Sequence, residues 1–69
     1  MRTTLEFDNM AEFLDFYREQ FGSMTLYRQA QILKINRSNI KRWLDGSATP
    51  SPESVKRIGE LIDARIFIR

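Results

Sequence analysis

The stretch that decides the fold is NRSNIKRWLDG, residues 36–46, because it combines an apolar and a basic character in one short run. Ile40 and Trp43 are three residues apart, so they share one face of a helix. Cationic side chains occupy other positions, at Arg37, Lys41 and Arg42. We therefore predict a helix over residues 37–45 that buries one face against a core and presents a basic face to a partner.

The residues around this helix supply its ends and a second helix before it. Asn36 is a suitable N-cap, and Gly46 suits the left-handed residue that ends many helices. Upstream, Thr25 can cap a helix over residues 25–33. The inward-facing positions of that helix are Leu26, Ala30 and Leu33. Two short helices joined by a tight turn, the second basic on one face, are typical of a helix-turn-helix motif.

A longer helix is expected before the motif, over residues 9–21. Either Asp8 or Asn9 can cap it. Apolar side chains recur in it at three- and four-residue steps, at Met10, Phe13, Leu14, Tyr17 and Phe21. Gly22 is expected to end this helix in a left-handed conformation.

A fourth helix is expected after the motif, over residues 52–63. Ser51 is its N-cap, and Pro52 fits the first helical position, where a missing N–H has no cost. Its inward positions are Val55, Ile58 and Leu61 or Ile62. Gly59 in its interior costs about 0.5–1 kcal/mol relative to Ala, so we expect close packing at that point.

The two ends of the chain are β-prone. RTTLEF (residues 2–7) alternates in polarity, and RIFIR (residues 65–69) is β-branched and aromatic. Continuation of the last helix through Ile66 and Phe67 is the alternative for the tail. The expected fold is thus one mainly α domain, residues 1–69, with four helices around a helix-turn-helix and short terminal strands.

Composition removes several classes of function. The chain has 69 residues, no Cys and no His, so it lacks disulfides, thiolate metal ligands and the usual neutral-pH acid–base group. Its apolar runs are too short for a membrane span, and we expect no signal peptide. We expect a cytoplasmic protein with no cofactor and no enzymatic activity.

Charge is distributed unevenly along the chain, although the net charge is only +2. Residues 1–20 hold five acidic side chains against two basic ones. Residues 24–44 hold five basic side chains and no acidic one. A basic stretch inside a balanced domain is the electrostatic signature of a polyanion binder, although a solvated basic face would show the same pattern.

The span from residue 21 to residue 62 resembles the Cro and lambda-repressor-like helix-turn-helix proteins of phages and bacterial mobile elements. The resemblance is carried by A-x-x-L-x-I-N-x-x-x-I-x-x-W-x-x-G over residues 30–46, followed by Pro50, Pro52 and an apolar-periodic helix. It implies that Ala30 lies where the motif helices cross. It implies base-reading positions at Arg37, Ser38 and Arg42, and base or phosphate contacts at Asn36, Asn39 and Lys41.

Two positions depart from the family pattern. Lys34 stands where the family's turn usually carries Gly, so a left-handed residue there would be strained. Leu26 stands where the family often has Gln at the start of its second helix. The phosphate contact of that Gln is then either missing or supplied instead by Tyr27, Arg28 or Gln29.

These patterns predict a transcription regulator that binds double-stranded DNA. By resemblance it would be a phage or mobile-element repressor that acts as a homodimer on a short palindrome near its own promoter. The tail residues Ile66, Phe67 and Ile68 are the candidates for dimer contacts. The alternative is a protein-interaction module, such as an antitoxin or inhibitor, whose basic helix meets an acidic partner.

Overall fold

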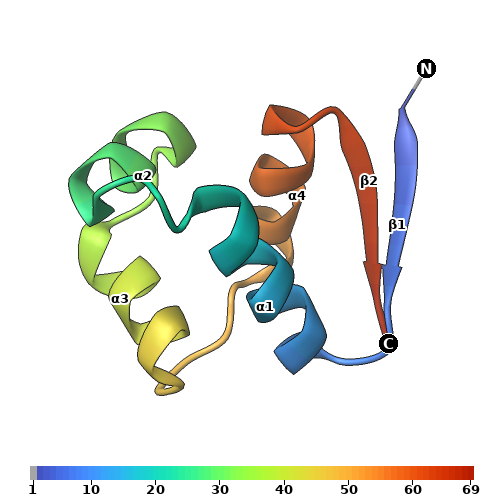
Figure 1. The fold of residues 1–69 in the computed structure, drawn as a ribbon, viewed down its shortest axis with the longest axis horizontal. Helices are drawn as coiled ribbons and strands as arrows, with labels where there is room; N and C mark the ends of the chain where they lie inside the picture. The colour runs from blue at the N-terminus through green and yellow to red at the C-terminus, as the bar shows by residue number, and fades with distance from the viewer. Residues whose placement is uncertain (1) are drawn as a thin grey trace.

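Four helices and two terminal strands make up the part of the chain that the computed structural model describes, residues 2–69. In chain order they are β1 (Thr3–Phe7), α1 (Met10–Phe21), α2 (Leu26–Leu33), α3 (Arg37–Asp45), α4 (Pro52–Leu61) and β2 (Ala64–Ile68). The predicted fold class is confirmed. Figure 1 shows α2 and α3 at one end, α1 and α4 in the middle and the two strands at the other end.

The helices begin where cap residues provide acceptors for free backbone N–H groups. Asn9, rather than Asp8, caps α1, and its Oδ1 accepts from the N–H of Glu12 at 2.9 Å. The Glu12 carboxylate in turn accepts from the N–H of Asp8, the residue before the cap, at 3.2 Å, whereas in a standard capping box it would accept from the N–H of the cap residue. The caps of the other helices are the predicted residues, at Thr25, Asn36 and Ser51.

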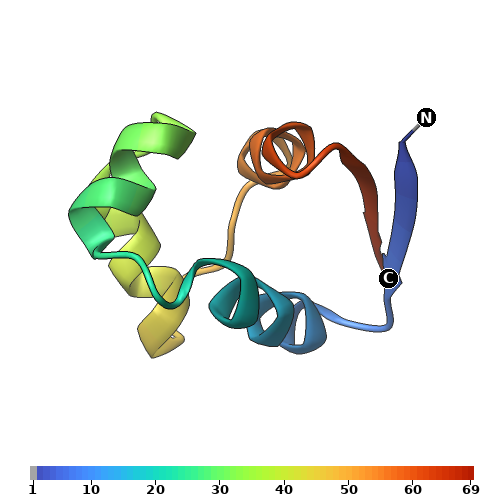
Figure 2. The same ribbon diagram turned by 45° about the horizontal axis from the view of Figure 1, so that its top comes forward.

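The core is built from buried residues of all four helices, whose arrangement Figure 2 shows. The predicted stripe on α1 is buried, apart from the half-buried Met10. It packs with buried residues of the other helices, Leu33, Ile40, Trp43 and Ile58. The rings of Tyr17 and Trp43 meet edge to face, with centroids 5.9 Å apart, so α3 is anchored directly on α1.

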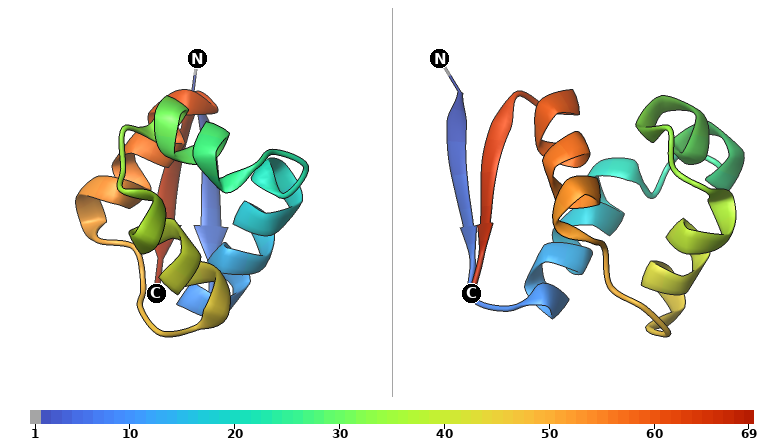
Figure 3. Two further views of the ribbon diagram at one scale, coloured as in Figure 1. Left: turned by 90° about the vertical axis from the view of Figure 1, so that its left-hand side faces the viewer. Right: turned by 180° about the vertical axis from the view of Figure 1, so that it is seen from behind.

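The two strands form a parallel ribbon in which Thr3 pairs with Ala64 and Phe7 pairs with Ile68. Parallel pairing requires a long crossover, and here all four helices lie between the strands. The helix continuation considered for the tail is wrong, because Asp63 adopts a positive φ of 55° after α4 and the chain then enters β2. The left view of Figure 3 shows the ribbon behind α1 and α4.

The three glycines differ in their roles. Gly46 has the predicted positive φ, 86°. Gly22 ends α1 as predicted, but the left-handed conformation expected there is wrong, because its φ is −64°. A Cβ at Gly22 would collide with the carbonyl of Arg18, so the steric need there is room and not left-handed geometry. A Cβ at Gly59 would lie 2.6 Å from the carbonyl oxygen of Ala64. The expected close packing at Gly59 is therefore present, against β2.

Candidate nucleic-acid interface

The turn between α2 and α3 depends on the left-handed conformation of Lys34, with φ 57° and ψ 42°. This conformation lets two successive N–H groups, of Lys34 and Ile35, bond the carbonyl of Ala30. The expected left-handed residue at this position is thus observed, on a side chain for which it is unfavourable. The turn brings the chain from α2 into α3 within three residues.

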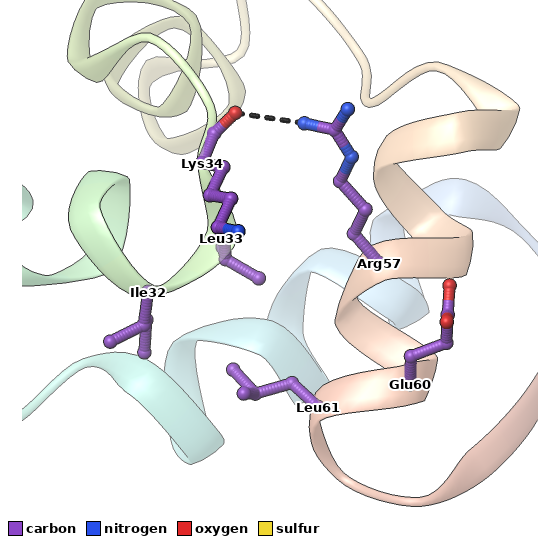
Figure 4. Close-up of a pocket in the computed structure, with 6 residues that line it drawn as sticks. All are labelled: Ile32, Leu33, Lys34, Arg57, Glu60 and Leu61. Carbon is purple, nitrogen blue, oxygen red and sulfur yellow. Dashed lines mark hydrogen bonds between the residues drawn. The ribbon is translucent and has the colours of Figure 1, made fainter.

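A second element holds the turn from outside the motif. Arg57, on α4, donates from Nη1 to the carbonyl oxygen of Lys34 at 2.8 Å, as Figure 4 shows. Its Nη2 also pairs with the Glu53 carboxylate at 3.2 Å, one helical turn back. A guanidinium presents several donors in a rigid fork, so it can bond both partners together. The left-handed turn is therefore fixed by α4 as well as by its own backbone.

Helix α3 has one buried and one open face. Ile40 is fully buried and Trp43 is 3% exposed, which leaves the indole no surface on which a base could stack. The open face consists of residues whose side chains are exposed to solvent: Arg37, Ser38, Asn39, Lys41 and Arg42. All the α3 positions at which the sequence predicted base or phosphate contacts are therefore exposed.

The cations of this face are not committed to ion pairs within residues 2–69. The ion pairs found there join Arg2 to Asp63, Arg18 to Asp15, Arg57 to Glu53 and Arg69 to Asp8. Arg37, Lys41 and Arg42 take part in none of them. Their charges remain available to an anionic ligand.

One acidic residue borders the face at the end of α3. Hydrogen bonds from the hydroxyl and the N–H of Ser47 lower the pKa of the Asp45 carboxyl, and the charges of Lys41 and Arg42 lower it further. Asp45 is thus a carboxylate at neutral pH, and it offsets part of the positive charge at the C-terminal end of α3. The N-terminal end, around Arg37, has no such neighbour on α3.

Asn36 has a structural role that limits what it can offer a ligand. Its Oδ1 accepts from the N–H of Ser38 at 2.8 Å and so caps α3. Because its oxygen is engaged in the cap, the amide can offer a base or a phosphate only its Nδ2 donor. Of the predicted contacts, Asn36 is therefore the one whose substitution would also weaken the helix.

Helix α2 contributes exposed side chains next to the start of α3. Tyr27 is 64% exposed, and Arg28 is also on the surface. A shallow hollow of about 340 Å³ is lined by Tyr27, Ala30, Gln31 and Arg37, so it spans the two motif helices. Gln31 was not among the predicted contacts. Its spacing of four residues from Tyr27 places both on one helix face and could have identified it.

The prediction that Gln29 contacts DNA is wrong. Gln29 is 3% exposed, and its Oε1 accepts from the Tyr17 hydroxyl at 2.6 Å while its Nε2 donates to the Met24 carbonyl at 2.9 Å. Both ends of the amide are used inside the protein. Burial raises the pKa of Tyr17 to about 12, so this phenol keeps its proton and can donate over the whole neutral range. The residue that the sequence suggested for phosphate instead ties α2 to α1.

The predicted dimer residues are divided between core and surface. Ile66 and Ile68 are half-buried and pack against the hydrophobic core of their own chain. Phe67 points away from it and is 55% exposed. Of these three side chains, Phe67 alone stands free for contact with another molecule.

Comparison with protein families, with curated proteins and with solved structures yields no match for this chain. Within residues 2–69, no helix is both long and apolar enough to cross a membrane.

Proposed function

We propose that this protein is a transcriptional regulator that binds double-stranded DNA in a sequence-specific manner by inserting α3 into the major groove. One observation carries the proposal. The exposed face of α3 bears Arg37, Lys41 and Arg42 without ion-pair partners among the described residues, while the opposite face is clamped by Ile40 and Trp43. A rigid helix with free guanidinium groups matches the groove in both width and chemistry.

The side chains divide into two expected roles. Arg37 and Arg42 can each donate two parallel hydrogen bonds to a guanine edge, and Ser38 can donate to or accept from either kind of base pair. Lys41 carries a compact charge that suits a phosphate. Tyr27 and Gln31 line a hollow with Arg37 at the start of α3, where the DNA backbone would pass, and the exposed Arg28 donates to Gln31.

The regulator is proposed to act as a homodimer on a palindromic operator, and to repress transcription there. A single short recognition helix reads only a few base pairs, so two copies spaced by one turn of DNA, about 34 Å, supply the missing specificity. Repression then follows from occupancy of a promoter and needs no further surface.

The test is selection of bound sequences from a random duplex library in excess competitor DNA, followed by a salt series on the selected site. The proposal predicts a palindromic consensus and an affinity that falls with about the 0.9 power of salt for each neutralised phosphate. Selection of no consensus would refute sequence-specific binding. If the basic face instead binds an acidic protein more tightly than any duplex, the interaction-module alternative would replace the proposal.

A further inference from the structure

The parallel ribbon has two edges, and they are not equivalent. β1 is the outermost element of the fold, while β2 lies between β1 and α4 (Figures 1 and 3). A two-stranded ribbon alone is marginal in water, and an open strand edge offers a row of unpaired backbone groups to any passing strand.

The hydrogen bonds of the ribbon identify which groups face outward. Thr3 donates to the carbonyl of Asp63 at 3.4 Å, and Arg69 donates to the carbonyl of Phe7 at 3.1 Å. Alternate residues of each strand bond the partner in a parallel ladder. It follows that the N–H and C=O groups of Thr4 and Glu6 point to the open side of β1.

The outer side of β2 is bordered by α4. The carbonyl of Ala64, which faces away from β1, lies so close to Gly59 that an added Cβ would be 2.6 Å from it. Farther along β2, the side chain of Ile66 lies within 3.5 Å of the same position. A strand could not pair along β2 from Ala64 onward without moving α4, whereas Thr3, Thr4 and Glu6 of β1 are exposed.

We propose that β1 is the dimer contact, pairing antiparallel with β1 of a second copy about a two-fold axis at Leu5. In this register the outward groups of Thr4 meet those of Glu6 of the partner subunit, twice by symmetry. The four strands would form one continuous sheet. Leu5, half-buried at present, would lie opposite the partner's Leu5 and extend the apolar face across the axis.

The charges of the strand favour this register. Arg2 would lie opposite the partner's Asp8, and both residues already sit at the ends of ion pairs, Arg2 with Asp63 at 3.6 Å and Asp8 with Arg69 at 3.5 Å. At each end of the interface, pairing would therefore align four charges of alternating sign: Asp63, Arg2, the partner's Asp8 and the partner's Arg69. An axis at Glu6 would oppose two carboxylates, which is unfavourable. An axis at Thr4 would also oppose unlike charges, Glu6 and the partner's Arg2, but it would set Leu5 against Thr3 and leave Asp8 outside the pairing.

The pairing supplies the second copy that a palindromic operator requires, and to that extent this inference rests on the proposed function. Its test uses no DNA, so the two can fail separately. Sedimentation of the whole chain over a concentration series should show a reversible dimer. Thr4→Pro removes one outward N–H, and we expect it to shift the species to monomer with unchanged circular dichroism. Phe67→Ala, on the outer face of β2, is the matched control and should still dimerise.

Cross-linking tests the register even if Thr4→Pro misfolds. The chain has no Cys, so single cysteines report only on their own position. Opposed residues of a hydrogen-bonded pair are about 5.5 Å apart at Cα, within disulfide range. A mixture of Thr4→Cys and Glu6→Cys chains should therefore form a mixed disulfide under mild oxidation, and each variant alone should form little. Self-linkage of Thr4→Cys as efficient as the mixed linkage, a monomeric wild-type chain, or dimer loss in Phe67→Ala but not in Thr4→Pro would each overturn the proposal.

Discussion

The guanidinium of Arg57 and the carbonyl of Lys34, 23 residues apart in the chain, are joined by a hydrogen bond of 2.8 Å. This bond connects α4 to the one turn in the motif where a non-glycine residue is left-handed. It gives α4 a direct part in setting the angle between α2 and α3. The recognition face thus depends on a residue that lies outside the motif.

Replacing Arg57 should test this dependence. We expect Arg57→Ala to lower the free energy of unfolding by about 1 kcal/mol, the typical net value of one hydrogen bond, since the accompanying ion pair is exposed and contributes little. Glu53→Gln removes that ion pair but leaves the bond to Lys34, so it should cost less. Denaturation in urea, followed by the fluorescence of the single Trp43, measures both. Equal costs for the two variants would show that the turn does not need the bond.

Replacement of Lys34 by glycine should leave the stability of the fold unchanged or raise it. A left-handed residue with a Cβ is strained by about 1–2 kcal/mol, and glycine relieves this at an entropy cost of about 0.5–1 kcal/mol. Lys34→Gly should therefore be neutral or raise the melting temperature, while Lys41→Gly, in the interior of α3, should lower it. A clear fall for Lys34→Gly would mean that the lysine stem packs usefully beside Leu33 and Leu61.

The exposed face of α3 should divide into specific and general contacts with DNA. Arg37→Ala or Arg42→Ala should each cost roughly 1–3 kcal/mol on the selected site and relax the preference at one base position. Lys41→Ala should weaken binding to all duplexes alike and reduce the salt slope by about one. Arg65→Ala, an exposed cation on β2, is the control for loss of charge alone. Unchanged affinity and selectivity in both motif Arg variants would refute the assignment.

Local chemistry in the sequence predicted the helices but not the contacts between them. Caps such as Thr25 and Asn36 act on neighbouring N–H groups, so the helix starts could be read directly. The burial of Gln29 could not be predicted in this way, because it depends on Tyr17, which lies 12 residues away on another helix. The same holds for the hydrogen bond from Arg57 to Lys34 and for the parallel register of the strands, because both link residues far apart in the chain. The open face of α3 could be predicted from the periodicity of the sequence, because the residues of a single helix form it.

Alkaline pH should destabilise the fold through Tyr17. The phenol is 1% exposed, and its pKa of about 12 in the fold lies above the ordinary tyrosine value of 10.0. The unfolded chain therefore loses this proton first, and stability is lost as pH rises from 10 towards 12, by up to about 1.4 kcal/mol per pH unit for this group.

Tyr17→Phe should remove that part of the slope, although it lowers stability at neutral pH by about 1–3 kcal/mol because Gln29 loses its buried donor. Tyr27→Phe, which removes a phenol that is 64% exposed, is the matched control for tyrosine content. Urea denaturation at closely spaced pH values gives the slopes, and identical slopes for Tyr17→Phe and the wild-type chain would show that this phenol does not carry the alkaline transition.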